Sequence, residues 1–599
     1  MTSYAAPLAD MRFVMRELAG LDAVAALPGC ADATPDLVDA ILEEAAKFGG
    51  EVLAPLNQPG DRQGCVFENG VVRTPDGFAD AYARFVEGGW NGVPFDPEYG
   101  GQGLPWLVST AVSEIWQAAN MAFSVCPMLN QGAVELISAH GLPEHKALFL
   151  PKMISGEWSG AMALTEPQAG SDLAQVRTKA VPDGDHYRVR GQKIFITYGE
   201  HDLARNIIHM VLARIEGAPA GIKGISLFII PKFLPGGDGT LGERNDLRCV
   251  SIEHKLGIHA SPTAVMSYGD GGGAVGYLVG EENRGIECMF TMMNAARLGV
   301  GLEGVAIAER AYQQARAFAM ERIQGRALGG GGADPVAIVD HPDVRRMLLS
   351  MRAQTEATRA LAYFVAACLD MAKRHQDEKV RRQRQTLVDL LTPVVKAWST
   401  DTGIEVANTG IQVHGGMGYV EETGAAQHLR DGRIAAIYEG TNGIQANDLV
   451  GRKVARDNGA GANAFIAMVR ELDRELAAAQ GDDIAAIRAR LAGGADALAG
   501  ATRWLVETYP SDPRTVAAGA VHYLRLLGIV AGGWLMARAA LIAAAGPAAG
   551  SGEGDPDFLR AKMVSARFFA DQVLVQAGML ATVFTQGAAF VRHEGPEGT

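Results

Sequence analysis

The sequence predicts a multidomain α+β protein with four parts: an N-terminal helical domain, a middle β-barrel-like domain, a helical bundle and an additional C-terminal helical bundle. Apolar residues recur at three- and four-residue spacing over residues 36–150 and again from residue 285 onward. Between these regions, short β-branched and aromatic runs are separated by Gly, Pro or Asp. The chain of 599 residues also exceeds what one hydrophobic core usually supports.

The first two predicted segments are an N-terminal extension, residues 1–35, and the N-terminal helical domain, residues 36–160. Charged residues interrupt the start of the extension, so it lacks the apolar core of a signal peptide. In the helical domain, apolar stripes at 37–45 and 107–118 flank a Gly/Pro-rich connector. We expect helices on both sides of this connector.

The middle β domain is predicted over residues 161–284. Its clearest strands are 187–191, 206–211 and 224–230. The order of helical, β and again helical regions excludes the alternating βα pattern of a doubly wound nucleotide-binding fold.

Two helical regions complete the chain, a bundle at 285–455 and an Ala-rich C-terminal helical domain at 456–599. The most membrane-like stretch, Leu526 to Ala537, is bounded by Arg525 and Arg538. It is shorter than the roughly 20 residues that span a bilayer. We therefore expect a buried helix and no integral membrane segment.

Composition narrows the function classes. A formal charge of −14 argues against a nucleic-acid-binding protein, which requires a basic face. The 6 cysteines are scattered without a CxxC pair, so neither a metal site nor a disulfide framework is predicted. These features favour an acidic enzyme of a reducing, cytoplasmic compartment.

The stretch 437–445, which reads IYEGTNGIQ, places Glu439 between apolar residues and Gly440. An apolar setting raises the pKa of a carboxylate, and a glycine lets a substrate carbonyl approach the backbone. Glu439 is therefore a candidate general base. The alternative is a helix N-terminus, where an acidic residue and a Gly-Thr pair are common.

Three further segments offer chemistry. Residues 163–172, ALTEPQAGSD, present hydroxyls and backbone N–H groups, or form an ordinary turn. A strand at 191–198 would place Phe195 and Thr197 on one face, able to flank a flat heterocycle or to pack on a core. Residues 412–419, QVHGGMGY, allow close approach of a phosphate, and we interpret His414 as structural.

Together these segments closely resemble the acyl-CoA dehydrogenase flavoprotein family over roughly residues 36–453. The family's first signature matches 163–172, its second matches 412–431, and the Glu439 block follows at the usual spacing. Gln175 and Gln427 depart from the signatures, and Phe195 stands where many relatives have Trp. The resemblance implies the acyl-CoA dehydrogenase fold with FAD as cofactor.

The resemblance also implies residue roles. Glu439 falls on the catalytic base. The positions implied for FAD are Met162, Leu164, Thr165, Gly170, Ser171, Phe195, Ile196, Thr197, Arg322, Gln412, Gly415, Gly416 and Thr441, with Arg322, Gln412 and both glycines holding its adenosine and pyrophosphate across a subunit interface. Those implied for substrate are Ser171, Asn294, Arg297 and Gly440.

The implied reaction is α,β-dehydrogenation of an acyl-CoA to a trans-2-enoyl-CoA, with an electron-transfer flavoprotein as partner. The extensions at both ends resemble the branch of 3-methylmercaptopropionyl-CoA dehydrogenases and its broad-specificity bacterial relatives, which implies a homodimer. An acyl-CoA oxidase that uses dioxygen is the alternative within the fold. A DNA-associated flavoprotein is the alternative from another class, although the basic run 379–384 adjoins acidic residues and is typical of a solvated helix face. The acyl chain, whether methylthio or another short or medium chain, is left open.

Overall fold

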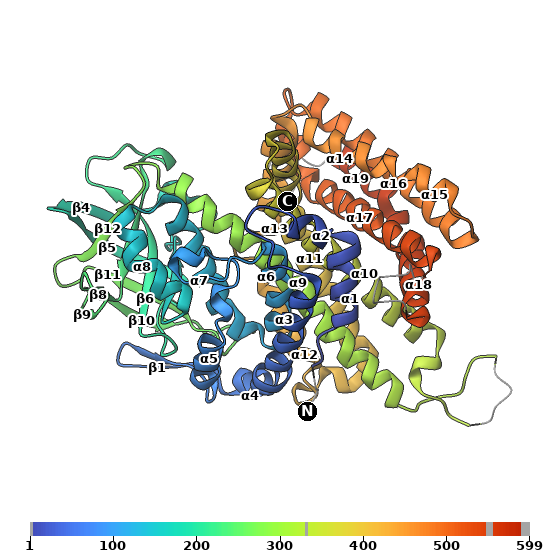
Figure 1. Ribbon diagram of the computed structural model, residues 1–599, viewed down its shortest axis with the longest axis horizontal. Coiled ribbons are helices and arrows are strands. Elements are labelled where there is room, and N and C mark those ends of the chain that lie inside the picture. The colour runs from blue at the N-terminus through green and yellow to red at the C-terminus, as the bar shows by residue number, and fades with distance from the viewer. Residues whose placement is uncertain (1–3, 330–333, 547–554, 589–599) are drawn as a thin grey trace, which may run out of the picture. The chain divides into compact units, whose positions relative to one another are not determined.

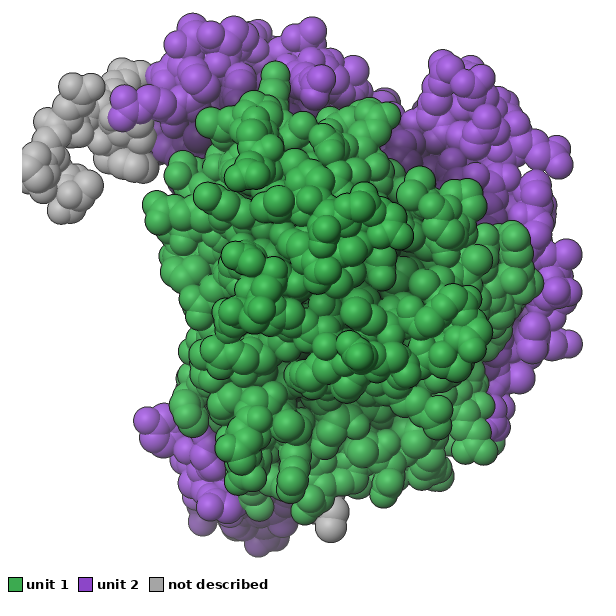
Figure 2. Space-filling view, turned by 90° about the vertical axis from the view of Figure 1, so that its left-hand side faces the viewer, with its two compact units in different colours: residues 1, 47–104, 119–299 green, residues 2–46, 105–118, 300–599 purple. Residues whose placement is uncertain are grey.

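The computed structural model describes residues 4–329, 334–546 and 555–588 (Figure 1). It comprises two compact units, coloured separately in Figure 2. Unit 1 contains residues 47–104 and 119–299, and unit 2 contains residues 2–46, 105–118 and 300–599. Each unit therefore combines segments that are distant in the sequence. The division of the chain into five domains stays a prediction.

Unit 1 combines helices with a β domain. Its helices are η2 (Gly49–Leu53), α4 (Ala54–Gln63), α5 (Phe78–Glu87), α7 (Met121–His140) and α8 (Pro143–Ser155). Its strands are β1 (Val66–Glu68), β2 (Val71–Arg73), β3 (Trp158–Ala163), β4 (Lys179–Asp183), β5 (His186–Thr197), β6 (Asn206–Ile215), β7 (Ser226–Pro231), β8 (Phe233–Pro235), β9 (Leu241–Arg244), β10 (Leu247–Ile252), β11 (Thr263–Tyr268) and β12 (Ala274–Val279).

Among its described residues, unit 2 contains helices and connecting loops but no β-strand. Its N-terminal elements are α1 (Leu8–Phe13), η1 (Val14–Leu18), α2 (Leu21–Ala25), most of α3 (Pro35–Phe48) and most of α6 (Trp106–Ala119). The long α9 (Gly285–Glu321) begins in unit 1 and ends in unit 2. The remaining elements include α10 (Pro342–Arg374), α11 (Glu378–His414), η8 (Gly415–Tyr419), α12 (Ala425–Gly432), α13 (Asn442–Asp448), α14 (Ala460–Glu471), α15 (Asp473–Ala478), α16 (Asp482–Thr508), α17 (Pro513–Ala545), α18 (Pro556–Gln572) and α19 (Ala577–Gln586).

Five strands of unit 1 close into a ring. β5 pairs with β12, β12 with β7, β7 with β6, and β4 pairs with both β6 and β5. The predicted strands 187–191 and 206–211 lie within β5 and β6, and most of 224–230 lies within β7. The β-barrel-like middle domain is therefore confirmed.

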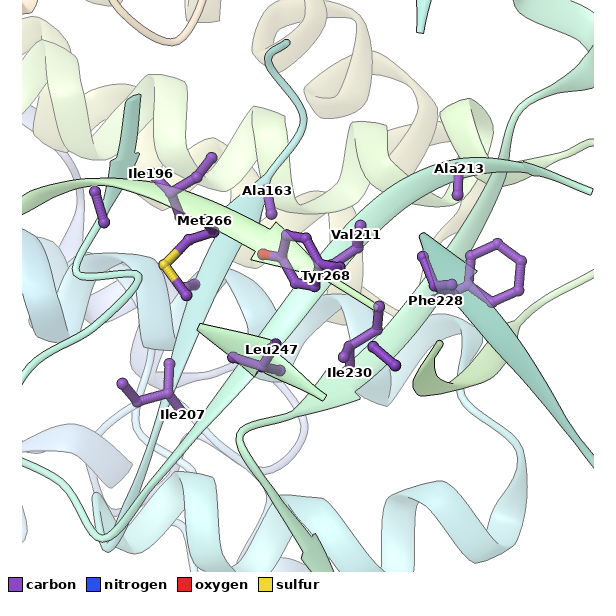
Figure 3. Packing of buried hydrophobic residues seen from close by; sticks show 14 of the residues in the cluster. Ala163, Ile196, Ile207, Val211, Ala213, Phe228, Ile230, Leu247, Met266 and Tyr268 are labelled. Atoms are coloured by element: carbon purple, nitrogen blue, oxygen red, sulfur yellow. The ribbon is translucent and has the colours of Figure 1, made fainter. Parts of the chain in front are cut away.

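The interior of this ring is filled by apolar side chains. Figure 3 shows Ile196 from β5, Val211 from β6, Phe228 from β7 and Tyr268 from β11 among its members. Each is at most 1% exposed. Complete burial of such a side chain contributes about 1.5–3 kcal/mol to the free energy of folding. The core thus holds the strands that carry the loops described below.

A β-hairpin inside the predicted helical domain was not anticipated. β1 and β2 pair through a two-residue turn, Asn69-Gly70, in which both residues have positive φ, 52° and 80°. Asn-Gly between two short runs that contain apolar residues is a strong hairpin signal, because the turn needs two left-handed residues. The helical spacing on either side obscured it.

The apolar stretch Leu526 to Ala537 lies within α17, where a buried helix was predicted. Asp512 caps this helix by accepting a hydrogen bond from the Thr515 N–H, and Pro513 occupies its first turn. Among the described residues, Pro513–Ala545 and Pro556–Gln586 are long and apolar enough to cross a membrane by length and composition, and the first is 78% buried over its most apolar window. Burial within the bundle accounts for the composition of α17.

A buried ion network joins four helices of unit 2 at Arg359 on α10. The Arg359 guanidinium contacts Asp10 at 2.5 Å, Glu114 at 2.6 Å and Glu309 at 2.7 Å, from α1, α6 and α9 respectively. Lys562 on α18 donates to the second oxygen of Asp10. The N-terminal extension and the C-terminal helices are thereby tied to the same central helix.

Replacing the shared cation should destabilise unit 2. Arg359→Met removes the guanidinium shared by three buried carboxylates, and removal of one member of a buried ion pair costs about 3–5 kcal/mol. We expect the free energy of unfolding, measured by urea titration of the whole chain, to fall by that amount. Arg382→Ala, which removes a solvated pair with Glu378, should change it by less than about 1 kcal/mol. Equal unfolding curves for both variants would contradict the network's role.

Candidate active site

The segment 163–172 forms a compact loop after β3 in unit 1. Glu166 and Ala169 exchange backbone hydrogen bonds of 3.0 and 2.9 Å, which closes its turn. The backbone N–H of Ile194 donates to the Thr165 carbonyl at 2.9 Å, so the loop is attached to β5. Thr165 is half-buried and Ser171 is exposed. The structure therefore brings the first signature together with the strand that carries Phe195 and Thr197.

Lys193, buried on β5, holds this loop in place. Its ammonium donates to the Leu164 carbonyl at 2.9 Å and to a Glu166 carboxylate oxygen at 2.8 Å. The same oxygen of Glu166 accepts from the Thr178 hydroxyl at 2.6 Å. Burial alone would raise the pKa of Glu166, but the Lys193 charge and the hydrogen bonds lower it to about 2. Sequence reasoning missed this pair, because Lys193 stands in a strand with several other polar and charged residues and nothing local marks it as buried.

β5 contains a bulge at Phe195. Lys193 pairs with Met266 and Ile196 with Ala264, so that Ile194 and Phe195 face one residue of β11. Phe195 has φ of 60° and is 59% exposed, whereas Ile196 is 1% exposed. The strand predicted over 191–198 is present as part of β5, and the bulge interrupts its alternation before Ile196. The bulge keeps an aromatic ring on the surface beside the half-buried Thr197.

Asn294 and Arg297, which the resemblance assigns to substrate, lie on the part of α9 that belongs to unit 1. The Arg297 guanidinium donates to the Asn294 side-chain oxygen at 3.2 Å. Arg297 is only 6% exposed. The pair is one turn apart, so the amide orients the guanidinium along the helix surface.

In unit 2, Glu439 and Gly440 stand in an unusual backbone conformation immediately before α13. Both have positive φ, 57° and 86°. Left-handed geometry is costly for a residue with a side chain and is found where the surrounding structure enforces it. Thr441 caps α13, its hydroxyl accepting from the Ile444 N–H at 3.2 Å. The helix N-terminus weighed against the catalytic interpretation is therefore present, but Glu439 precedes it.

Buried polar side chains from α11 and α13 hold this segment. Lys396, fully buried on α11, donates to the Gly440 carbonyl at 2.8 Å and to Asn442 at 2.9 Å. Gln445 donates to the Glu439 carbonyl at 3.2 Å. These hydrogen bonds to the carbonyl groups of Glu439 and Gly440 fix the backbone at the predicted base. The Glu439 side chain itself is half-buried.

The completely buried carboxyl group in this region is Glu303 on α9, which sequence reasoning did not single out. The Tyr438 hydroxyl donates to it at 2.5 Å. Burial raises the pKa of Glu303 to about 8, against the opposing hydrogen bond from Tyr438 and the charge of Lys396. The signal in the sequence was a single acidic residue within an apolar helical stretch, 299–308.

The residues implied for adenosine and pyrophosphate lie at the ends of α9 and α11. Phe318 and His414 stack with ring centroids 4.5 Å apart, which joins these two helix ends. His414 is 5% exposed and is hydrogen-bonded to the Gly410 carbonyl; its structural role stays a prediction. Arg322 and Gln412 are exposed, and a Cβ at Gly415 or Gly416 would meet nothing within 4 Å.

These residues fit the parts of FAD to which the resemblance assigns them. Phe195 offers an exposed aromatic face, Thr165 and Thr197 offer hydroxyls, and the glycines leave open space for a diphosphate. Of the implied positions, Ile196 turns its side chain into the barrel core and can contribute only its backbone. Glu439, Thr441 and Gly440 belong to unit 2, and the Thr165 and Thr197 segments to unit 1.

Four family models match the chain in succession. They are the N-terminal domain of acyl-CoA dehydrogenase at 36–157, its middle domain at 161–270, its C-terminal domain at 283–454, and an acetyl-CoA dehydrogenase C-terminal-like domain at 463–592. The matched segments cover most of the chain.

Two relatives match along nearly their whole length. The 3-methylmercaptopropionyl-CoA dehydrogenase of Ruegeria pomeroyi is 49% identical over 96% of each chain. The broad-specificity linear acyl-CoA dehydrogenase FadE5 of Mycobacterium tuberculosis is 33% identical, again over 96% of each. Among solved structures, an acyl-CoA dehydrogenase complexed with FAD from Bacillus anthracis superimposes with a TM-score of 0.73 at 20% identity, covering 94% of this chain and 90% of its own.

The ion pair of the first loop should give unit 1 a pH-dependent stability. Because the pKa of Glu166 is lowered from its ordinary value of 4.5 to about 2, its contribution is fully present above pH 4.5 and is lost as the pH falls toward about 2. We expect Glu166→Gln to lower the melting temperature at neutral pH and to flatten its decline in acid. Glu243→Gln, on the exposed β9, should retain the wild-type profile. If the melting temperature of Glu166→Gln varied with pH as in the wild type, the ion pair would not be the cause of the pH-dependent stability.

Proposed function

The chain belongs to the acyl-CoA dehydrogenase family, and from that premise we propose that Glu439 is the base that starts α,β-dehydrogenation of an acyl-CoA thioester. The enzyme is FAD-dependent and acts on CH–CH groups. The observation that supports the role of Glu439 is its enforced left-handed backbone, anchored by Lys396 and Gln445. Proton abstraction from carbon requires a base in a fixed position, and these bonds fix the backbone that carries the Glu439 carboxylate.

The chain's own residues perform the proton chemistry. The α C–H bond breaks and its proton moves to a Glu439 carboxylate oxygen. The electron pair left on the α-carbon forms the new double bond as the β C–H bond breaks. Bound FAD supplies the two-electron acceptor that takes the β-hydrogen with its electron pair. The product is the trans-2-enoyl-CoA.

The thioester oxygen gains negative charge as the α-proton leaves. We propose that the backbone N–H of Glu439 donates to it, with the absent Cβ at Gly440 permitting close approach. A side chain at Gly440 would also meet the Gln445 amide at 2.7 Å, so this glycine serves the anchoring of the segment too. We assign Ser171, Asn294 and Arg297 to acyl-CoA, Arg297 providing the positive charge that suits a phosphate-rich ligand.

We propose 3-methylmercaptopropionyl-CoA as a substrate. Support comes from the relative that bears this name and matches at 49% identity over 96% of the chain. Other short and medium acyl-CoA chains remain candidates, because a relative with broad linear specificity also matches over the whole length. The methylthio chain carries a sulfur in place of a methylene, and hydrophobic pockets discriminate such isosteres weakly.

An electron-transfer flavoprotein is the proposed electron acceptor. The relatives reported above are dehydrogenases by name, which supports this choice over an oxidase reaction with dioxygen. The DNA-associated alternative is less well supported, since the basic run at the start of α11 is a helix face on which Arg382 pairs with Glu378.

We further propose a cytoplasmic homodimer. Exposed apolar side chains surround the implied adenosine region in unit 2, including Ile323 at 60%, Met417 at 52% and Tyr419 at 89% exposure. Exposed apolar groups of this size are typical of protein interfaces. The six cysteines are all free, which supports a reducing compartment.

Removing the ionisable group of Glu439 should impair the dehydrogenation step and leave folding and binding intact. We expect Glu439→Gln to fold, retain its yellow flavin and bind acyl-CoA, but to reduce the flavin at least about 10³-fold more slowly, because no base takes the α-proton. Single-turnover flavin bleaching measures this rate. Glu507→Gln, exposed on α16, serves as the matched control and should bleach normally. Near-normal bleaching by Glu439→Gln would refute the assignment.

The substrate and acceptor are testable in one series. In a panel of acyl-CoA compounds, we expect the short-chain thioesters, including the methylthio thioester, to bleach the flavin fastest. Reoxidation by air with product bound should be slow, and reoxidation by an electron-transfer flavoprotein fast. Rapid reoxidation by air would instead identify an oxidase.

A further inference from the structure

A buried carboxyl group, Glu303, is bonded to Tyr438, the half-buried residue directly before the proposed base. Glu303 on α9 is 0% exposed, and the Tyr438 hydroxyl donates to one of its oxygens at 2.5 Å. The other oxygen has no hydrogen-bond partner among the described residues. A completely buried carboxyl group with one oxygen unbonded is energetically costly, and such a group in a native structure calls for an explanation.

The pair is mechanically connected to Glu439. Tyr438 is the residue before Glu439, and its hydroxyl is hydrogen-bonded to Glu303 on α9. Gly440, the residue after, is held through its carbonyl by Lys396 on α11. The left-handed turn at Glu439 and Gly440 therefore lies between two buried anchors from different helices. Loss of either anchor would let this strained turn relax.

The pair is also electrostatically connected to Glu439. The charged and titratable groups that act on Glu303 are Tyr438, Lys396 on α11 and Glu439 itself. Because burial raises the pKa of Glu303 to about 8, this group is neutral at pH 7 and places no like charge beside Glu439. At higher pH, ionised Glu303 repels the Glu439 carboxylate and strengthens it as a base. During abstraction, negative charge moves from Glu439 to the substrate, and so away from Glu303.

We propose that Glu303 is a positioning residue for the α-proton abstraction: through Tyr438 it fixes the backbone of Glu439, and through its own ionisation it sets the strength of that base. The proposal rests on the assignment of Glu439 as base. It adds a second carboxyl group, 136 positions away in the sequence, to the apparatus of the reaction (303 against 439).

Two variants separate the two parts of the proposal. Glu303→Gln keeps an acceptor for the Tyr438 hydroxyl but cannot ionise. Tyr438→Phe keeps the ionisable group but removes the hydrogen bond. Tyr363→Phe is the matched control, since the Tyr363 hydroxyl donates at 2.8 Å to a different buried carboxylate, Glu114, in the same unit.

The rate of flavin reduction at saturating acyl-CoA is measured from about pH 6 to about pH 10. The wild type should show a rise in rate with an apparent pKa near 8, and Glu303→Gln should lose that rise while keeping its KM. Tyr438→Phe should slow reduction about 10-fold across the range, with KM little changed. Tyr363→Phe should lower only the melting temperature.

A second readout does not depend on turnover. Infrared difference spectra of the holoenzyme between neutral and alkaline pH should show loss of a protonated carboxyl band in the wild type and no such loss in Glu303→Gln. If Glu303→Gln showed the same pH profile and the same infrared difference spectrum as the wild type, ionisation of Glu303 would not set the strength of the base. A wild-type rate in Tyr438→Phe would overturn the positioning role, even if Glu303→Gln did not fold.

Failure of the proposed function has a different outcome. It would appear as normal flavin reduction by Glu439→Gln, or as no reduction of the wild type by any acyl-CoA. The infrared titration of Glu303 would still be measurable in that case. If Glu439→Gln is inactive while Glu303→Gln follows the wild-type profile, only the inference about Glu303 fails.

Discussion

The helical unit depends on one cation. Arg359 forms ion pairs with carboxylates from α1, α6 and α9. Asp10 of α1 also forms an ion pair with Lys562 of α18. Buried charges are tolerated only when they are paired and hydrogen-bonded, so these helices must assemble in one arrangement. The chain's additions at both ends are thereby built into the core of unit 2. That core also contains the helices α9 and α11, from which the Glu439 segment is held.

The loop at 163–172 and the Glu439 segment are held by the same kind of contact. In unit 1, buried Lys193 reaches out of β5 to a loop carbonyl and to Glu166. In unit 2, buried Lys396 reaches out of α11 to the Gly440 carbonyl and to Asn442. An ammonium group offers three donors from one point, and desolvation strengthens each bond. Irregular backbone can therefore be held as rigidly as a helix or strand.

Two residues to which the proposed function assigns a role have a strained backbone conformation. Phe195 and Glu439 both have left-handed backbones, at φ of 60° and 57°, although neither is a glycine. The first keeps an aromatic ring on the surface, and the second precedes a capped helix. Such conformations cost about 1–3 kcal/mol each and persist because neighbouring contacts outweigh them.

The sequence by itself determined the order of helical and β regions, the buried helix α17, and the short motifs that contain Glu439, Thr165 and Gln412. These are local features, carried by periodicity and by neighbouring residues. Only the tertiary structure revealed Glu303 beside Tyr438, 135 residues apart, and Arg359 beside Asp10, 349 residues apart. The bulge at Phe195 likewise depends on the register with β11. Such partners are chosen by packing between distant segments, and no periodicity in the chain records which buried charge will meet which.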